Sequence, residues 1–160
     1  MATNYAAIGL PEFLFWQVIQ AIGQSNYVIG TSQLFCPNQS EDYVYYCWFQ
    51  SSCDLIQDQS WWNSWVFKFK FAGTNQYVMI PLADLAYSRN GRCYLAFSRL
   101  DMDVLTNSDQ IILGASFLQQ FNALFWYNYT AGTTTLSLTQ SPNNTLSGFY
   151  LGNFNYTVEP

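Results

Sequence analysis

Residues 66–71 of this 160-residue chain, VFKFKF, alternate strictly between aromatic and non-aromatic side chains. In an extended strand the three phenylalanines project to one face and the two lysines to the other, so the stretch predicts a half-buried β-strand. The segment AGTNQ (72–76) then predicts a turn, and YVMIP (77–81) predicts a returning strand whose pairing ends at Pro81. We interpret the lysine face as solvated and as a guard against aggregation.

A helix is predicted near the N-terminus. Pro11 suits the first helical position, Glu12 complements the helix dipole, and Gly23 is expected to end the helix. An apolar stripe recurs at helical spacing and is expected to face the core: Leu14, Val18 and Ile22.

The rest of the chain predicts short strands and one more helix. YVYYCW (43–48) reads as a strand, IIL (111–113) as a buried strand that meets Gly114, and residues 115–121 as a short helix. NALFWYNY and TTTLSL predict a second hairpin about the turn TAG, and residues 141–160 are expected to be a polar, loop-like tail. The predicted fold is a mainly β single domain over residues 1–140 with two short helices.

Composition excludes several classes of function. Half of the residues are hydrophobic and 9% are charged, with a net charge of −5, so no basic stripe is available for nucleic acid. No apolar run reaches the roughly 18 residues that a membrane span requires. Histidine is absent, which removes histidine-activated nucleophiles and imidazole metal sites. Hydrolytic chemistry would therefore have to use carboxylates, and we expect no metal site and no cofactor.

The four cysteines are open to three interpretations: free thiols, metal ligands or two disulfides. Their spacing matches no zinc pattern, which favours disulfides. Four glycosylation sequons indicate the same oxidising, secretory, vacuolar or extracellular environment; they begin at Asn38, Asn128, Asn143 and Asn155. The first 25 residues lack a basic n-region and contain Pro11 and Glu12, so they do not resemble a cleavable signal peptide.

The order of these parts resembles the C-terminal lobe of the pepsin-like aspartic peptidases. That lobe begins with D-[TS]-G-T-[ST] and runs through small and apolar residues to a proline that starts a helix, and TNYAAIGLPEFLFWQVI matches everything after the glycine. FKFAGTNQYVMIP resembles the family hairpin with one extra residue. Ile112, Leu113 and Gly114 resemble the hydrophobic-hydrophobic-glycine motif, and the helix and hairpin that follow also match. Ala115 and Trp126 stand where the family often has aspartate.

The resemblance implies a site and a cysteine pairing. Thr3 matches the second threonine of the motif and Asn4 replaces the usual serine, so both would border the catalytic position, with Ile112 to Gly114 behind it. The motif aspartate itself would precede Met1. The family pairing implies a disulfide between Cys53 and Cys93, which leaves Cys36 to pair with Cys47.

The implied function is one half of a peptide-binding cleft in an aspartic endopeptidase. Such enzymes hydrolyse peptide bonds with two carboxylates that share a proton, one from each lobe. No aspartate of the chain precedes a [TS]-G pair, and Asp101-Met102-Asp103 is a weak cation site, so the chain alone is expected to be inactive. The implied partners are an N-terminal peptidase lobe or a second copy of the chain.

An alternative is a secreted binding or interaction module. The tryptophans of SWWNSWVF could stack sugar rings on a flat platform, although tryptophans beside a phenylalanine-rich strand are more often core residues; they are Trp61, Trp62 and Trp65. The exposed former lobe interface is the other surface that such a module would use.

Overall fold

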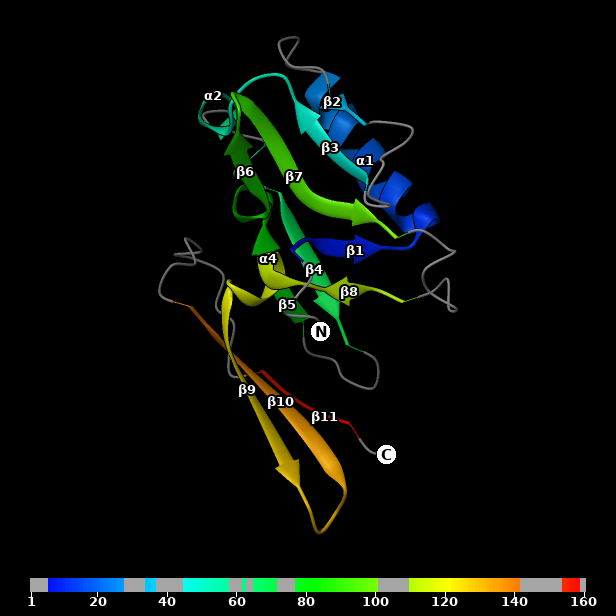
Figure 1. The fold of residues 1–160 in the computed structure, drawn as a ribbon, viewed down its shortest axis with the longest axis vertical. Helices are drawn as coiled ribbons and strands as arrows, with labels where there is room; N and C mark the ends of the chain where they lie inside the picture. Colours follow the sequence, from blue (N-terminus) through cyan, green and yellow to red (C-terminus); the bar gives the residue numbers. More distant parts are fainter. Residues whose placement is uncertain are drawn as a thin grey trace.

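The computed structural model describes residues 6–27, 34–36, 45–57, 62, 65–71, 77–100, 110–141 and 154–158. Strands predominate among them, so the mainly β fold is confirmed. The strands form three sheets. Figure 1 shows an upper body that contains the largest sheet and a long hairpin sheet that projects below it.

The central strand of the largest sheet is β7 (Arg92–Arg99). One edge of β7 pairs with β3 (Tyr45–Phe49), which in turn pairs with β2 (Leu34–Phe35). The opposite edge is shared, because β6 (Ala86–Arg89) pairs with the first half of β7 and β1 (Ile8–Leu10) with the second half. Residues Cys93 and Leu95 to Ser98 of β7 are buried, as expected for a strand covered on both faces.

The turn between β6 and β7 is a two-residue hairpin turn. Asn90 and Gly91 both have positive φ, 52° and 73°, and Arg89 pairs directly with Arg92. This backbone matches the right-handed twist of the paired strands, which is why Asn-Gly is favoured there.

The N-terminal helix α1 (Glu12–Tyr27) packs against this sheet (Figure 1). Its buried residues are Phe15, Ile19 and Ile22, whereas Leu14 and Val18 of the predicted stripe are half-buried beside them. The prediction that the helix ends at Gly23 was wrong, since the helix continues to Tyr27. A glycine inside a helix costs only about 1 kcal/mol, which the buried face offsets.

The first predicted hairpin is confirmed. β4 (Val66–Lys70) pairs in antiparallel register with β5 (Tyr77–Pro81), while the predicted turn at 72–76 lies outside the described residues. The phenylalanine face packs on the core: the Phe67 ring lies 4.8 Å from Phe97, and the Phe69 ring lies 5.6 Å from Phe117. Lys68 and Lys70 are exposed, as the alternation predicts.

Among the described residues, three further short helical segments have defined bounds. They are α2 (Cys53–Gln57), the 3-10 helix η1 (Leu82–Leu85) and α4 (Ala115–Leu118). The first two were not predicted, and α4 is shorter than the helix predicted over 115–121 because β9 already begins at Phe121.

The second predicted hairpin is also confirmed. β9 (Phe121–Asn128) and β10 (Thr133–Gln140) pair over their full lengths. The prediction of a loop-like tail was wrong for β11 (Phe154–Val158), which pairs with β10. The base of this sheet is anchored in the core by Phe121, Leu136 and Leu138.

Candidate functional site

β8 (Ile112–Leu113), which contains two of the predicted site residues, pairs with β1. β1 runs parallel to β7 on one side and antiparallel to β8 on the other, with Ile8 opposite Leu113 and Gly9 opposite Ile112. Immediately beyond, both the backbone N–H and the hydroxyl of Ser116 donate to the Ala6 carbonyl, at 2.9 and 2.6 Å. Segments more than 100 residues apart in sequence therefore lie side by side.

Gly114 turns the chain from β8 into α4. Its carbonyl accepts hydrogen bonds from the backbone N–H groups of Phe117 and Leu118, both at 3.1 Å. Leu113 and Gly114 are buried and Ile112 is half-buried, so this motif supports β1 from the protein interior, while Ile111 of the predicted buried strand is exposed. Thr3 and Asn4, which were expected to border the same place, lie outside the described residues.

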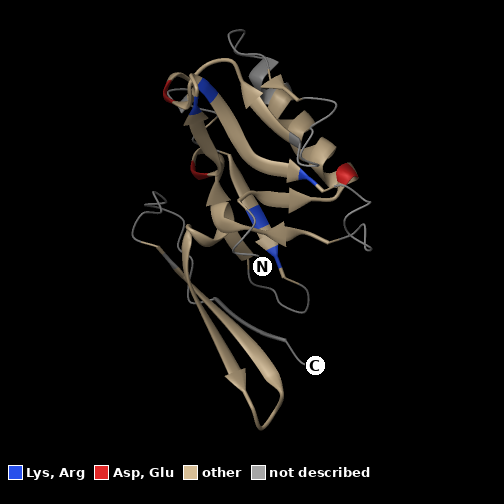
Figure 2. Cartoon of the chain, in the orientation of Figure 1, with Lys and Arg blue, Asp and Glu red and all other residues tan. Residues whose placement is uncertain are grey.

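A pocket of about 390 Å³ lies beside this junction. Its wall is largely apolar and comes from β1, α1, β4, β7 and β8; it includes Leu10, Leu14, Val18, Phe67, Phe97 and Leu113. Lys68 and Lys70 also line it, and Figure 2 shows both as blue segments on β4. Aliphatic groups fit such a wall, and the ammonium groups can donate hydrogen bonds to carbonyl or carboxylate oxygens.

This pocket was not predicted from the sequence, which placed Leu14 and Val18 in the core and the two lysines on a solvated face that does not bind. The helical period identifies one face of α1 and the strand alternation identifies the two faces of β4. Neither pattern indicates whether α1 and β4 pack against each other or leave a pocket between them.

Carboxylates are not gathered at this site in the part of the chain that the structure describes. None lines the pocket, and no group of three or more acidic, cysteine or histidine residues could hold a metal ion there. Glu12 instead accepts a hydrogen bond of 2.7 Å from Arg99 Nη1. Asp54 is exposed and Asp84 is half-buried, and the pair Asp101 and Asp103 lies outside the described residues.

Of the three tryptophans that could have formed a platform, Trp62 is a core residue, as expected for tryptophans beside a phenylalanine-rich strand. Trp62 is fully buried, and its ring lies 5.9 Å from Phe49 in an edge-to-face arrangement. Trp65 is half-buried against the core, and Trp61 lies outside the described residues. A fully buried indole cannot present a face to a sugar, so burial excludes a platform built from all three.

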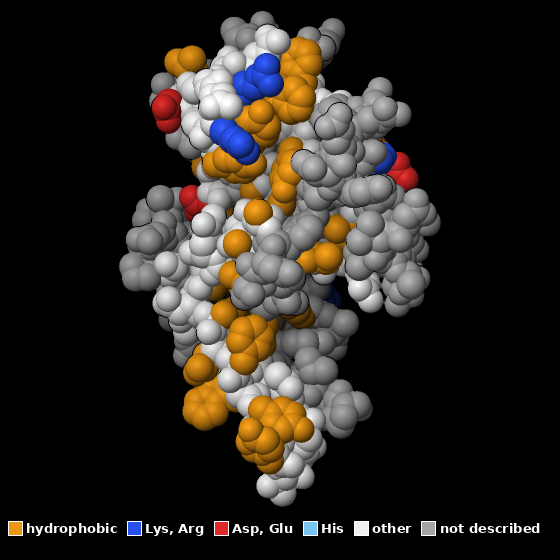
Figure 3. Space-filling model, in the orientation of Figure 1, with side chains coloured by type: hydrophobic (Ala, Val, Ile, Leu, Met, Phe, Trp, Pro, Cys, Tyr) orange, Lys and Arg blue, Asp and Glu red, His pale blue; other side chains and the backbone are white. Residues whose placement is uncertain are grey.

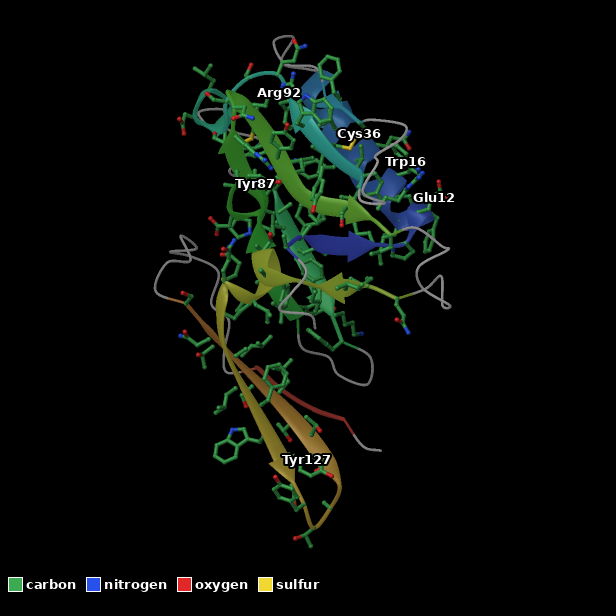
Figure 4. The ribbon with its side chains drawn as sticks, viewed as in Figure 1. Glu12, Trp16, Cys36, Tyr87, Arg92 and Tyr127 are labelled. Atoms are coloured by element: carbon green, nitrogen blue, oxygen red, sulfur yellow. A yellow bond between two sulfur atoms is a disulfide. The ribbon has the colours of Figure 1, made fainter. Side chains whose placement is uncertain are left out.

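A different aromatic row lies across the largest sheet, one ring per strand. Phe35, Trp48, Tyr94 and Tyr87 are successive cross-strand partners in β2, β3, β7 and β6, with ring centroids 6.3, 5.8 and 5.6 Å apart. The Arg92 guanidinium, labelled in Figure 4, lies 5.3 Å from the centre of the Trp48 ring. We call these four rings the aromatic ladder. The outer two contacts are stacked and the contact between Trp48 and Tyr94 is tilted. Such cross-strand aromatic pairs, together with the cation–π contact, stabilise the sheet.

Both predicted disulfides are present. Cys36–Cys47 links the end of β2 to β3, and Cys53–Cys93 links α2 to β7. No cysteine is free. The two bonds are compatible with a secreted or extracellular location.

Several consecutive apolar side chains of β9 are exposed, and this was not predicted from the sequence. Leu124, Phe125, Trp126 and Tyr127 are 52 to 62% exposed, and Tyr129 beyond them is 88% exposed. Figure 3 shows separate groups of hydrophobic side chains on the lower part of the molecule as well as on the upper body, and Figure 4 labels Tyr127 on the lower part. A signal was available, since no charged residue occurs from 110 to 158.

Within the described residues, no helix has the length and apolar character needed to cross a membrane. Comparisons with protein families, with curated proteins and with solved structures found nothing that matches this chain.

Proposed function

We propose that the chain is a lobe similar to the C-terminal half of a pepsin-like aspartic endopeptidase, and that it forms one side of a cleft for an extended polypeptide. The observation that carries this proposal is the position of β1 between a parallel and an antiparallel strand, with α1 directly after it. The resemblance implies this proximity of the N-terminal segment to Ile112, Leu113 and Gly114. The disulfide between Cys53 and Cys93 supports the same alignment.

The residues that line the pocket indicate which groups of a peptide the proposed cleft could bind. Its apolar wall suits an aliphatic or aromatic side chain of a bound peptide, and Lys68 and Lys70 can donate to the peptide carbonyls. Hydrolysis needs a pair of close carboxylates, and none of the described acidic residues lines the pocket. The chain therefore contributes peptide binding, and catalysis requires a second lobe together with a motif aspartate.

The test restores the motif. Replacement of Met1-Ala2 by Asp-Thr-Gly completes D-T-G-T ahead of Asn4, and the matched control carries Asn-Thr-Gly. Each form is mixed with the N-terminal lobe of a pepsin-like peptidase and assayed at acid pH on an unfolded polypeptide. We expect the mixture that contains the aspartate form to cleave the polypeptide, and a statine-type transition-state analogue to inhibit this cleavage. The mixture that contains the asparagine form should not cleave. Statine-sensitive cleavage by the unaltered chain alone, or equal cleavage by both forms, would contradict the proposal.

A second function is favoured by the exposed side chains of β9. Among the described residues β9 pairs with β10 alone, and this long edge contains no charge, proline or bulge that would prevent further pairing. An interaction module would use this edge to bind a second copy of the chain. Sedimentation should then show association that decreases when Phe125 and Tyr127 are both replaced by serine. The matched control replaces Phe13 and Tyr77, which are similarly exposed elsewhere, and should leave association unchanged.

A further inference from the structure

The hairpin of β9 and β10 has two chemically different faces. Phe121, Ala123 and Phe125 share one face with Leu136 and Leu138, and this face joins the core at its base. Leu124, Trp126 and Asn128 lie on the opposite face because side chains alternate along a strand. Their direct partners on β10 are Ser137, Thr135 and Thr133, so we call this side the hydroxyl face.

Asn128 stands at the exposed end of the hydroxyl face. Its backbone pairs with Thr133, and its carbonyl accepts a 2.8 Å hydrogen bond from the Gly132 N–H, which closes the turn. The side-chain Oδ1 accepts hydrogen bonds from the backbone N–H groups of Thr130 and Ala131, at 3.0 and 3.2 Å. Two donors converge on this atom, which identifies it as the oxygen. The amide Nδ2 is therefore directed away from the turn backbone.

We propose that Asn128 carries an N-linked glycan whose first sugar covers the indole of Trp126. This inference is separate from the proposed peptidase lobe and does not depend on it. Asn128, Tyr129 and Thr130 form an acceptor sequence, all three are exposed, and the paired cysteines are compatible with the compartment in which such glycans are added.

The modification is a substitution at the anomeric carbon of a polyprenyl-diphosphate-linked oligosaccharide. The Asn128 Nδ2 forms a bond to that carbon, the bond from the carbon to the diphosphate oxygen breaks, and one Nδ2 proton passes to a base. The polyprenyl diphosphate leaves with the electron pair of the broken bond. Oδ1 keeps both of its hydrogen bonds, so the turn is unchanged by the reaction.

Trp126 is the side chain that the glycan would cover. It precedes Asn128 by two residues and so lies on the same face, about 7 Å away along the strand. Its side chain is 62% exposed on a sheet without charge, where such an apolar surface otherwise promotes association. A sugar ring presents C–H groups to the indole, and its hydroxyls can bond to the Thr133 hydroxyl beside Asn128. The opposite face, with Phe125 and Tyr127, stays uncovered.

The other sequons differ in position. Asn155 lies within β11, where its backbone pairs with Ser137, and Asn38 and Asn143 lie outside the described residues. Among the four sequon asparagines, Asn128 is the one whose side chain the structure describes, and the proposal is made for it.

The experiment expresses the full chain behind a secretion signal in a eukaryotic cell and maps its peptides by mass spectrometry. Release with peptide N-glycosidase in heavy-oxygen water should convert Asn128 to a labelled aspartate. Thr130→Ser retains the acceptor sequence and should keep the glycan, whereas Thr130→Ala should lose it. Secreted protein in which Asn128 is unlabelled would overturn the proposal.

A second experiment tests whether the glycan covers the indole of Trp126. Oxidative footprinting should label Trp126 weakly in the glycosylated protein and more strongly after enzymatic removal of the glycan, while labelling of Tyr127 on the other face stays constant. Equal labelling of Trp126 in both samples would show that the glycan does not cover the indole. The Thr130→Ala protein, which lacks the glycan without any enzyme treatment, is the control. Its Trp126 should be labelled as strongly as in the enzymatically deglycosylated protein.

Discussion

The ring centroids of Trp62 and Phe49 lie 5.9 Å apart in the core, with the two rings in an edge-to-face arrangement. Trp62 precedes β4, and Phe49 belongs to β3. Both side chains have no exposed surface. This contact makes Trp62 a core residue and separates it from the exposed tryptophan of β9, Trp126.

Replacement of Trp62 by alanine should therefore lower the free energy of unfolding by about 3 to 5 kcal/mol, because a large buried ring is lost and a cavity remains. Trp126→Ala is the matched control, since it removes the same side chain from an exposed position and should change stability by less than about 0.5 kcal/mol. Urea denaturation of both variants measures the difference. Equal effects would contradict the assignment of Trp62 to the core.

The two disulfides should contribute unequally to stability. Cys53 and Cys93 are 40 residues apart, whereas Cys36 and Cys47 are 11 apart. In the chain-entropy model the longer loop stabilises by about 4 kcal/mol and the shorter by about 3 kcal/mol. Paired serine replacements, followed by denaturation under non-reducing conditions, should therefore show the larger loss for Cys53 and Cys93. The opposite order would show that native-state packing outweighs loop closure.

Tyr87 at the end of the aromatic ladder should make stability decrease at alkaline pH. Burial raises the pKa of its phenol from the ordinary value of 10.0; the charge of Arg89 opposes this rise and Tyr94 adds to it. The unfolded chain then loses its proton at a lower pH than the folded protein does. Stability is unaffected below about pH 10 and falls as the pH rises through the folded-state pKa.

Thermal denaturation from neutral pH to above pH 10 measures this effect. The chain has 12 tyrosines, so the comparison must be between variants. Tyr87→Phe should reduce the alkaline loss of melting temperature, and Tyr129→Phe, which changes an 88% exposed residue, should reproduce the parent profile. Identical profiles for the parent and Tyr87→Phe would rule out this contribution.

The ion pair between Glu12 and Arg99 should contribute little. The Glu12 side chain is 50% exposed, so water and salt screen the pair even though the oxygen lies 2.7 Å from the nitrogen. A double-mutant cycle with Glu12→Gln and Arg99→Met should give a coupling energy of about 0.2 to 1 kcal/mol that decreases at high salt. A coupling energy that is independent of salt would indicate a buried pair.

Some elements could be predicted from the sequence because their signals are local. The alternation in VFKFKF predicted both the strand and its buried phenylalanine face, and the two segments around TAG predicted the hairpin of β9 and β10. The hairpin at Asn90-Gly91 was not predicted, although its dipeptide is a strong turn signal. Two predictions were wrong: that the first helix ends at Gly23, and that the whole C-terminal tail is a loop. The length of a helix and the pairing of β11 both depend on packing against distant segments.

The sequence by itself determined the mainly β class, the hairpins β4–β5 and β9–β10, and the even set of cysteines, because each depends on residue types a few positions apart. Only the tertiary structure decided which of the tryptophans are buried, that β1 lies between β7 and β8, and that α1 and β4 leave a pocket beside them. The physical reason is that burial and strand pairing depend on segments far apart in the chain. Identical side chains such as Trp62 and Trp126 therefore have opposite environments, which no local pattern distinguishes.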